Sequence, residues 1–370
     1  MHKFFTATND ASIYLQQPEQ NAGRDEILEV GKLYYGSSKD ITRTLIKFDT
    51  GSIKSEITSI GSGSWQTYLV LRSANSQEIP LEYTIHANAV YGSWSMGTGT
   101  KFDNITSDGV SWYYKDGINK WTDVFGALQN TDYPPQTQGA LSGTTGSINN
   151  GGGGFWYSGS TASQSFSNEP DDIRINVTSI VNLWVSGSLP NNGFVLHHTL
   201  DAENNDLDYG LLKFFSKETN TIYEPKLEMV WDDSSFVTGS LTPVTGSASD
   251  DYKVVVTNLK NEYSKDTKIK IRVKGRDMFP YKTFGTTFGY DQAKYLPSGS
   301  TYYQIEDYVT NEIIVPFGDY SKLSCDSTSN YFNLDTSTYA ADRVYRLKIK
   351  ILQNGITDII DDKLTFKIIE

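Results

Sequence analysis

The fold of this chain is decided by the stretch Asp172-Ile-Arg-Ile-Asn-Val177-Thr-Ser-Ile-Val-Asn-Leu-Trp184. Its first part alternates apolar and polar residues with the period of a half-buried strand. Thr178 is the expected N-cap of a short helix, because Ile180, Val181 and Trp184 have the spacing of one helix face. The sequence therefore predicts a strand that leads directly into a helix.

Working outward, the helix is expected to end at Gly187, because glycine adopts the left-handed conformation that terminates helices. Strands are expected to follow at residues 193–196, 211–216 and 226–231. A strand, a short helix and a returning strand would close one open end of a β-sandwich core.

The composition is that of strands and turns. The 370 residues include 24 Tyr, 17 Phe, 7 Trp and 31 Gly, and residue types of this kind are enriched in strands and turns. Strand-like runs also occur at residues 4–15, 26–31, 43–49, 68–72 and 81–87. We therefore predict an all-β fold whose first domain, residues 1–235, is a jelly-roll-type β-sandwich.

A second, smaller β domain is predicted over residues 236–370, after a polar connector rich in Gly, Ser and Thr. Its expected strands are residues 253–257, 268–274, 312–316, 343–352 and 364–369. In Tyr345-Arg-Leu-Lys-Ile-Lys-Ile351 the apolar and basic side chains alternate, which predicts a sheet with one basic face toward water or toward a partner.

The order of motifs in residues 1 to 232 resembles the DNRLRE domain of bacterial surface proteins, which also occurs in looser versions in bacteriophage structural proteins. The motifs are Asp10-Ala-Ser-Ile13, Leu28-Glu-Val-Gly31, Arg43-Thr-Leu-Ile-Lys-Phe-Asp49, Gly109-Val-Ser-Trp112 with Trp121 and Gly126, Ile175-Asn-Val-Thr178, Val181-Asn-Leu-Trp184, Asn192-Gly-Phe-Val-Leu196 and Pro225-Lys-Leu227. The motif that names the family is not found. The resemblance implies a jelly-roll sandwich in proteins that often bind surfaces or glycans, and the C-terminal half resembles the immunoglobulin-like modules of phage tail and neck proteins.

Four of the seven tryptophans lie in residues 90–157, and this aromatic group has two interpretations. Rings on loops can stack on sugars, and large rings can also serve as core or inter-subunit packing. The candidates for glycan or partner binding are Trp94, Tyr113, Trp156 and Tyr157. The expected core residues are Phe48, Trp112, Trp121, Trp184 and Phe194. The Gly-rich segment 139–154 is expected to be a flexible insertion or hairpin tip.

No catalytic or cofactor-binding motif is recognised. His197 and His198 end an expected strand, so their side chains should alternate and at most one should point inward. Residues 201–210 are dense in oxygen ligands, and this segment is either a calcium loop or, as we favour, a solvated turn. The only cysteine, Cys325, excludes an intrachain disulfide. We expect no cofactor and no enzymatic activity.

The net charge of −12 and the lack of a basic cluster argue against nucleic-acid binding. No apolar run is long enough for membrane insertion, and no signal peptide is recognised. The sequence predicts a non-enzymatic structural component of a bacteriophage virion, in the tail, neck or fibre, assembled in the host cytoplasm through contacts with other virion proteins and with copies of itself. The alternatives are a carbohydrate-binding module or adhesin that recognises a host-surface polysaccharide, and a polysaccharide-cleaving enzyme.

Overall fold

The computed structural model describes residues 1–36, 38–61, 63–121, 152–167, 171–246, 251–279 and 293–370. Strands make up 47% and helices 10% of the structure. Soluble proteins contain about 20–25% strand on average, so the chain belongs to the all-β class. The predicted fold class, a β-sandwich followed by a second β domain, is confirmed.

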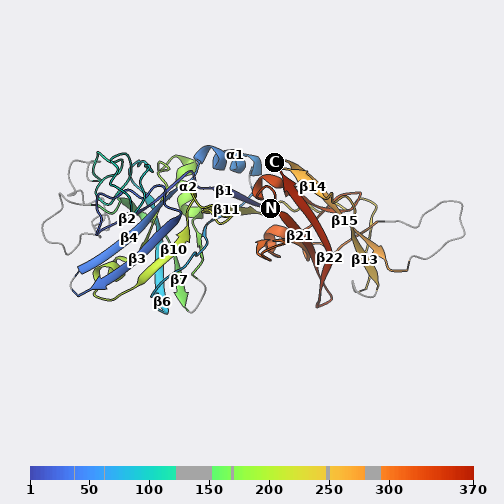
Figure 1. Ribbon diagram of the computed structural model, residues 1–370. Coiled ribbons are helices and arrows are strands. Elements are labelled where there is room, and N and C mark those ends of the chain that lie inside the picture. The colour runs from blue at the N-terminus through green and yellow to red at the C-terminus, as the bar shows by residue number, and fades with distance from the viewer. Residues whose placement is uncertain (37, 62, 122–151, 168–170, 247–250, 280–292) are drawn as a thin grey trace, which may run out of the picture. The chain divides into compact units, whose positions relative to one another are not determined.

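The chain forms two compact units. In Figure 1 most of the first unit is coloured blue to yellow, and residues 230–370 of the second are coloured yellow to red. The N-terminal unit consists of Phe5–Gly61 and Gln66–Met229. The C-terminal unit consists of Met1–Phe4, Ser62–Trp65 and Val230–Glu370. The first residues of the chain therefore belong to the unit that contains its last residues.

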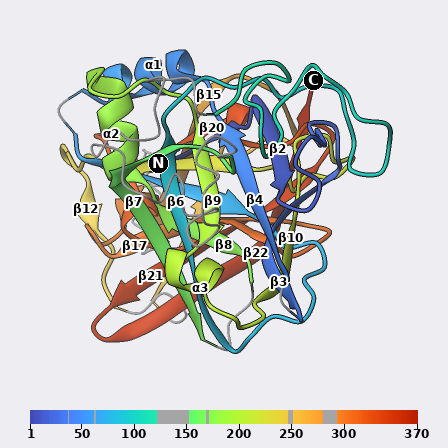
Figure 2. The ribbon, with the colours of Figure 1, turned by 90° about the vertical axis from the view of Figure 1, so that its left-hand side faces the viewer.

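The larger sheet of the N-terminal unit is antiparallel, with the strand order β10-β3-β4-β9-β6-β7 and with β2 paired to β4 (Figure 2). Its strands are β2 (Asn9–Tyr14), β3 (Ile27–Tyr35), β4 (Ser38–Lys47), β6 (Glu82–Val90), β7 (Trp156–Ser167), β9 (Phe194–His198) and β10 (Gly210–Phe215). A four-stranded sheet has the order β1-β11-β5-β8. Its strands are β1 (His2–Thr6), β5 (Trp65–Leu71), β8 (Ile173–Asn176) and β11 (Lys226–Trp231).

The strand and the helix predicted from residues 172–187 are both present. In β8, Ile173 and Ile175 are buried and the residues between and after them are exposed. Helix α2 (Thr178–Ser186) ends at Gly187, whose φ of 78° is left-handed as expected. The predicted N-cap is wrong by one residue, because Val177 occupies that position.

The Thr178 hydroxyl makes hydrogen bonds that differ from the expected helix cap. Its oxygen accepts a hydrogen bond from the Thr67 amide at 2.9 Å, and its hydroxyl donates to Asn176 Oδ1 at 2.7 Å. Thr178 thus ties the first turn of α2 to the neighbouring strands β5 and β8.

A second helix, α1 (Thr50–Ile60), was not predicted from the sequence. Its N-cap is Asp49, whose carboxylate accepts a hydrogen bond from the Ser52 amide at 2.7 Å. The segment is rich in Thr, Ser and Ile, which are poor helix formers, so propensity gives little signal. The third helix, α3 (Leu200–Asn204), is one short turn.

The larger sheet is covered on both faces. On one face, Trp184 of α2 packs on Phe194 of β9 with ring centroids 4.6 Å apart, and Phe48 contacts the same ring at 6.2 Å. All five expected core residues are at most 2% exposed. On the opposite face, side chains of the sheet pack against side chains from segments outside its strands. The cluster contains Ala11, Ile13, Ile41, Leu45, Val90, Trp156 and Val195 from the strands, and Trp94, Val110, Trp112, Trp121 and Phe155 from the segments that cover them.

The end of the Gly-rich segment differs from the expected loop tip. Residues 139–151 lie outside the described residues, but Gly152, Gly153 and Gly154 are buried. The Gly153 amide donates to Trp112 O at 2.8 Å, and its carbonyl accepts from Arg43 at 2.7 Å. A side chain would not fit here, because a Cβ on Gly152 would lie 2.3 Å from Trp112 O. These glycines allow the backbone to pass directly over a buried ring.

The C-terminal unit contains two sheets, each of which is antiparallel except for one parallel pairing, β12 with β16 in the first and β14 with β22 in the second. One has the order β12-β16-β15-β20-β19, with β13 paired to β15. Its strands are β12 (Thr242–Pro243), β13 (Tyr252–Val256), β15 (Lys268–Asp277), β16 (Lys294–Tyr295), β19 (Ser324–Cys325) and β20 (Asn330–Asp335). The other has the order β14-β22-β21-β17-β18. Its strands are β14 (Glu262–Ser264), β17 (Thr301–Asp307), β18 (Ile313–Val315), β21 (Val344–Gln353) and β22 (Ile356–Ile369).

The alternation in β21 is present, and its basic face is charge-compensated. Arg346 Nε lies 2.9 Å from an oxygen of Asp361, and Lys348 Nζ lies 2.8 Å from Glu306. The apolar residues at alternate positions of β21 are buried in the core of this unit. The face predicted to be open and basic is therefore largely neutralised by the neighbouring strands.

We predict that Trp184→Ala lowers the free energy of unfolding by roughly 3 to 5 kcal/mol, because it removes a large side chain that is 2% exposed. Trp184→Phe should cost less, since the indole N–H has no hydrogen-bond partner among the described residues. Chemical denaturation measures both variants, with Leu207→Ala, at a residue 63% exposed, as the control. Equal stability of Trp184→Ala and wild type would contradict the core assignment.

Gly153→Ala should destabilise the protein by about 1 to 3 kcal/mol, because its φ of +76° is strained for alanine. The new Cβ would also lie 2.7 Å from Arg43 Nη1. The matched control is Gly159→Ala, where a Cβ meets no atom within 4 Å. Thermal and chemical unfolding should show a clearly lower stability for Gly153→Ala than for Gly159→Ala. Equal stabilities would show that the close contact of Gly153 with Arg43 is unimportant.

Candidate binding sites

The tryptophans proposed for glycan or partner binding are largely buried. Trp94 is 8% exposed and its indole N–H donates to Asn192 O at 2.7 Å. Trp156 is 2% exposed, and its ring stacks on His197 with centroids 4.5 Å apart. The structure brings both rings into the same buried cluster, where they face protein atoms.

The two tyrosine candidates are half-buried. Tyr113 packs against the same cluster and lies edge-on to Tyr114, with centroids 6.5 Å apart. Tyr157 lies beside Tyr91 at 4.8 Å, and burial raises the pKa of its hydroxyl. The four proposed residues therefore form no shared open platform among the described residues.

A buried ion pair lies beneath Trp156. Arg43 Nε and Nη2 donate to the two carboxylate oxygens of Glu203 at 3.0 and 2.5 Å, and both side chains are fully buried. The guanidinium carbon of Arg43 lies 4.8 Å from the Trp156 ring centroid and 5.2 Å from that of Trp112. The bidentate contact and the two rings fully surround the guanidinium, so this charge serves the fold.

Oxygen atoms of segment 201–210 bind positively charged side chains of the protein itself. Glu203 binds Arg43, and Asn205 Oδ1 accepts a hydrogen bond from Lys32 Nζ at 2.8 Å. The segment also contains the helix α3 in place of an open turn. Within the described residues, no group of three or more His, Cys, Asp or Glu side chains is placed to hold a metal ion.

The expectation that at most one of the paired histidines points inward is wrong, because both are 1% exposed. Strand β9 lies between β4 and β6, and both faces of the sheet are covered. His197 stacks on Trp156, whereas His198 lies 5.3 Å from Tyr209. Neither ring nitrogen of His198 has a hydrogen-bond partner among the described residues. Burial lowers the pKa of His198 to about 4.

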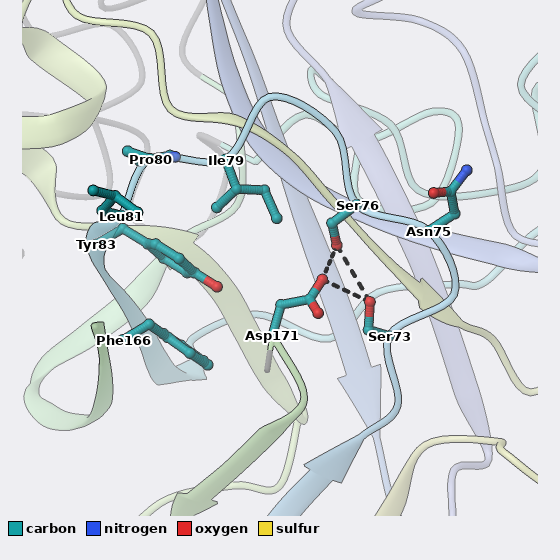
Figure 3. A pocket seen from close by; sticks show the side chains of 9 residues that line it. All are labelled: Ser73, Asn75, Ser76, Ile79, Pro80, Leu81, Tyr83, Phe166 and Asp171. Atoms are coloured by element: carbon teal, nitrogen blue, oxygen red, sulfur yellow. Dashed lines mark hydrogen bonds between the residues drawn. The ribbon is translucent and has the colours of Figure 1, made fainter. Parts of the chain in front are cut away.

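An open pocket of about 450 Å³ lies at the start of β6 and is shown in Figure 3. This Asp171 pocket is lined by Ser73, Asn75, Ser76, Ile79, Pro80, Leu81, Tyr83, Phe166 and Asp171. Tyr83 and Phe166 are directly paired across β6 and β7, and their rings stack at 4.5 Å with an angle of 10°. Pocket volumes of about 300 to 1,000 Å³ are typical of small-molecule sites.

One wall of the Asp171 pocket is polar. The Ser73 and Ser76 hydroxyls both donate to Asp171 Oδ2, the first at 2.6 Å. In Figure 3 the Tyr83 hydroxyl points toward Asp171 across the pocket. Burial raises the pKa of Tyr83, and the Asp171 charge raises it further, so the hydroxyl keeps its proton and can donate a hydrogen bond.

The loop that carries the two serines is fixed on both sides. The Ser73 amide donates to Asp172 Oδ1 at 2.8 Å. The amides of Ala74 and Gln77 donate to carbonyls of β10 at 2.7 and 2.9 Å. The polar wall is therefore held in place before any ligand arrives.

Sequence reasoning did not identify the Asp171 pocket. Tyr83 is one apolar position of an expected strand, and Phe166 stands alone in a segment rich in Ser. Only the strand register shows that these two residues are neighbours. The nearest signal in the sequence is the Asp171-Asp172 pair immediately before the strand that opens the fold-deciding stretch.

A rigid turn in the C-terminal unit exposes three large apolar side chains. Tyr308 and Val309 follow β17, Ile313 is the first residue of β18, and the three are 55%, 70% and 50% exposed. The buried carboxylate of Asp307 accepts hydrogen bonds from the Val309 and Thr310 amides at 2.9 and 3.0 Å.

Arg343 Nε also donates to Asp307, at 2.8 Å. Burial by itself would raise the pKa of Asp307, but the two amide bonds and Arg343 lower it below its ordinary value, so the turn is held by a carboxylate.

Among the described residues, no helix is both long enough and apolar enough to cross a membrane. A scan against protein-family models and a search of curated protein sequences both find no match for this chain.

We predict that His198→Phe flattens the acid limb of the stability curve. The unfolded chain protonates His198 near its ordinary pKa of 6.5 and the folded protein only near 4, so the contribution of His198 to stability falls as the pH falls through this window. The variant should lack a slope of up to about 1.4 kcal/mol per pH unit.

Chemical denaturation at several pH values measures the two slopes. Asp10, whose pKa burial raises to about 7, contributes an opposite slope to both proteins and cancels in the comparison. Identical slopes in wild type and variant would contradict the assignment of a buried, unprotonated His198.

Proposed function

We propose that this protein is a non-enzymatic structural component of a bacteriophage virion, in the tail, neck or fibre, that acts through contacts with other virion proteins and with copies of itself. The resemblance of residues 1–232 to DNRLRE-type phage proteins, and of the C-terminal half to immunoglobulin-like modules, supports this proposal. The all-β build in two units agrees with such a role.

The observation that carries the proposal is the rigid turn between β17 and β18. Exposed apolar side chains that gather on one part of the surface are typical of interaction sites, and these three belong to one short segment of the chain. Because Asp307 already holds the turn amides, docking a partner on Tyr308, Val309 and Ile313 would cost little ordering entropy. Strand β18 is also the last strand of its sheet, and such edges are commonly covered by a partner.

We expect Val309→Asp to reduce self-association, because it places a charge in the centre of the apolar turn. Sedimentation velocity over a range of protein concentrations measures the effect. Val237→Asp is the matched control, since Val237 is 65% exposed but lies outside the turn. Self-association that responds equally to both substitutions would place the contact elsewhere, and a wild type that is monomeric at every concentration would remove self-assembly from the proposal.

Membership of a virion is tested on particles. Antibodies against the purified chain should label intact phage particles from the source culture at one structural position in electron micrographs. Detection of the chain only in the soluble fraction, with unlabelled particles, would refute a structural role in the virion.

A further inference from the structure

From the geometry of the Asp171 pocket we infer that it is a binding site for a neutral hexopyranose residue. The pocket combines apolar side chains, a hydrogen-bond acceptor and a hydrogen-bond donor on a fixed frame. This ligand class is additional to the assembly contacts proposed above.

The acceptor is the carboxylate of Asp171. Its Oδ2 already accepts the two serine hydroxyls, and no hydrogen bond to Oδ1 occurs among the described residues. No ion pair to Asp171 occurs among the same residues either. Hydrogen bonds to an ionised carboxylate are stronger than those between neutral groups, so a ligand hydroxyl would be held well here.

The donor is the hydroxyl of Tyr83. It keeps its proton because burial and the Asp171 charge raise its pKa. No hydrogen bond from this hydroxyl is made within the described part of the chain. It faces Asp171, so the pocket presents a free donor opposite a free acceptor (Figure 3).

A sugar hydroxyl matches this pair, because one O–H group can donate to Asp171 while its oxygen accepts from Tyr83. An organic ammonium ion would satisfy only the carboxylate, since it has no acceptor for the Tyr83 proton. Ile79, Pro80 and the 73% exposed Leu81 supply apolar contact for the C–H groups of a pyranose ring. The donor and acceptor together thus favour a neutral polyol over a cation.

The frame of the pocket is preorganised. Stacking on Phe166 fixes the Tyr83 ring, and the hydrogen bonds of Ser73 and Ser76 orient the carboxylate. Gly210, with a φ of +66°, lets β10 approach the serine loop, because a Cβ there would lie 2.4 Å from Gln77 O. Little ordering is left for a ligand to impose, which favours binding.

The test is saturation-transfer difference NMR on the full chain with D-glucose, D-galactose, N-acetyl-D-glucosamine and L-rhamnose at millimolar concentrations, and with tetramethylammonium, which has no hydroxyl, as the cationic probe. We expect saturation transfer to at least one sugar and none to tetramethylammonium. Tyr83→Phe, which removes only the hydroxyl, should weaken the binding of that sugar about five- to tenfold. Asp171→Asn should weaken it by tenfold or more, because it removes a charge-assisted bond.

Tyr114→Phe is the matched control, since it removes a hydroxyl that does not line the pocket. Unchanged melting temperatures would show that Tyr83→Phe and Asp171→Asn still fold. If no panel sugar binds, or if a bound sugar is indifferent to both pocket substitutions, the inference is overturned. Tetramethylammonium binding that Asp171→Asn abolishes would overturn it in favour of a cation site.

Discussion

The bidentate contact between Arg43 and Glu203 is the interaction on which the N-terminal unit depends most. It joins β4 to α3, and the third contact of Arg43 holds Gly153 in the segment that leads into β7. Removing two charges from water is costly and is repaid only where the geometry satisfies every group. Here the carboxylate and the Gly153 carbonyl meet the guanidinium, so the pair specifies where three distant segments lie.

The consequences extend over one whole face of the larger sheet. Trp112 and Trp156 pack on the Arg43 guanidinium, and they are members of the cluster that covers this face. On this face His197 is buried against the Trp156 ring. On the opposite face His198 is buried beside Tyr83 and Tyr209. In a simple sandwich one face of β9 would be exposed to solvent, whereas here both of its faces are covered.

Carboxylates also organise the two surfaces that we assign to binding. Asp171 accepts hydrogen bonds from two hydroxyls on one wall of its pocket, and Asp307 accepts hydrogen bonds from two backbone amides beneath the exposed turn. In each case a half-buried or buried acidic group fixes the neighbouring chain and leaves apolar side chains exposed beside it. The two surfaces differ in character, since the first is a pocket and the second is a protrusion.

The sequence by itself determined the all-β class, most strand positions and the helix stop at Gly187, because these depend on local period and on the backbone freedom of one glycine. It missed α1, whose composition gives little helix signal, and it placed Trp94 and Trp156 among binding candidates. Only the tertiary structure decided which faces are covered. The period of a strand shows which side chains share a face, but the residues that cover that face are far away in the sequence. Glu203 covers Arg43 in this way, and Phe166 covers Tyr83.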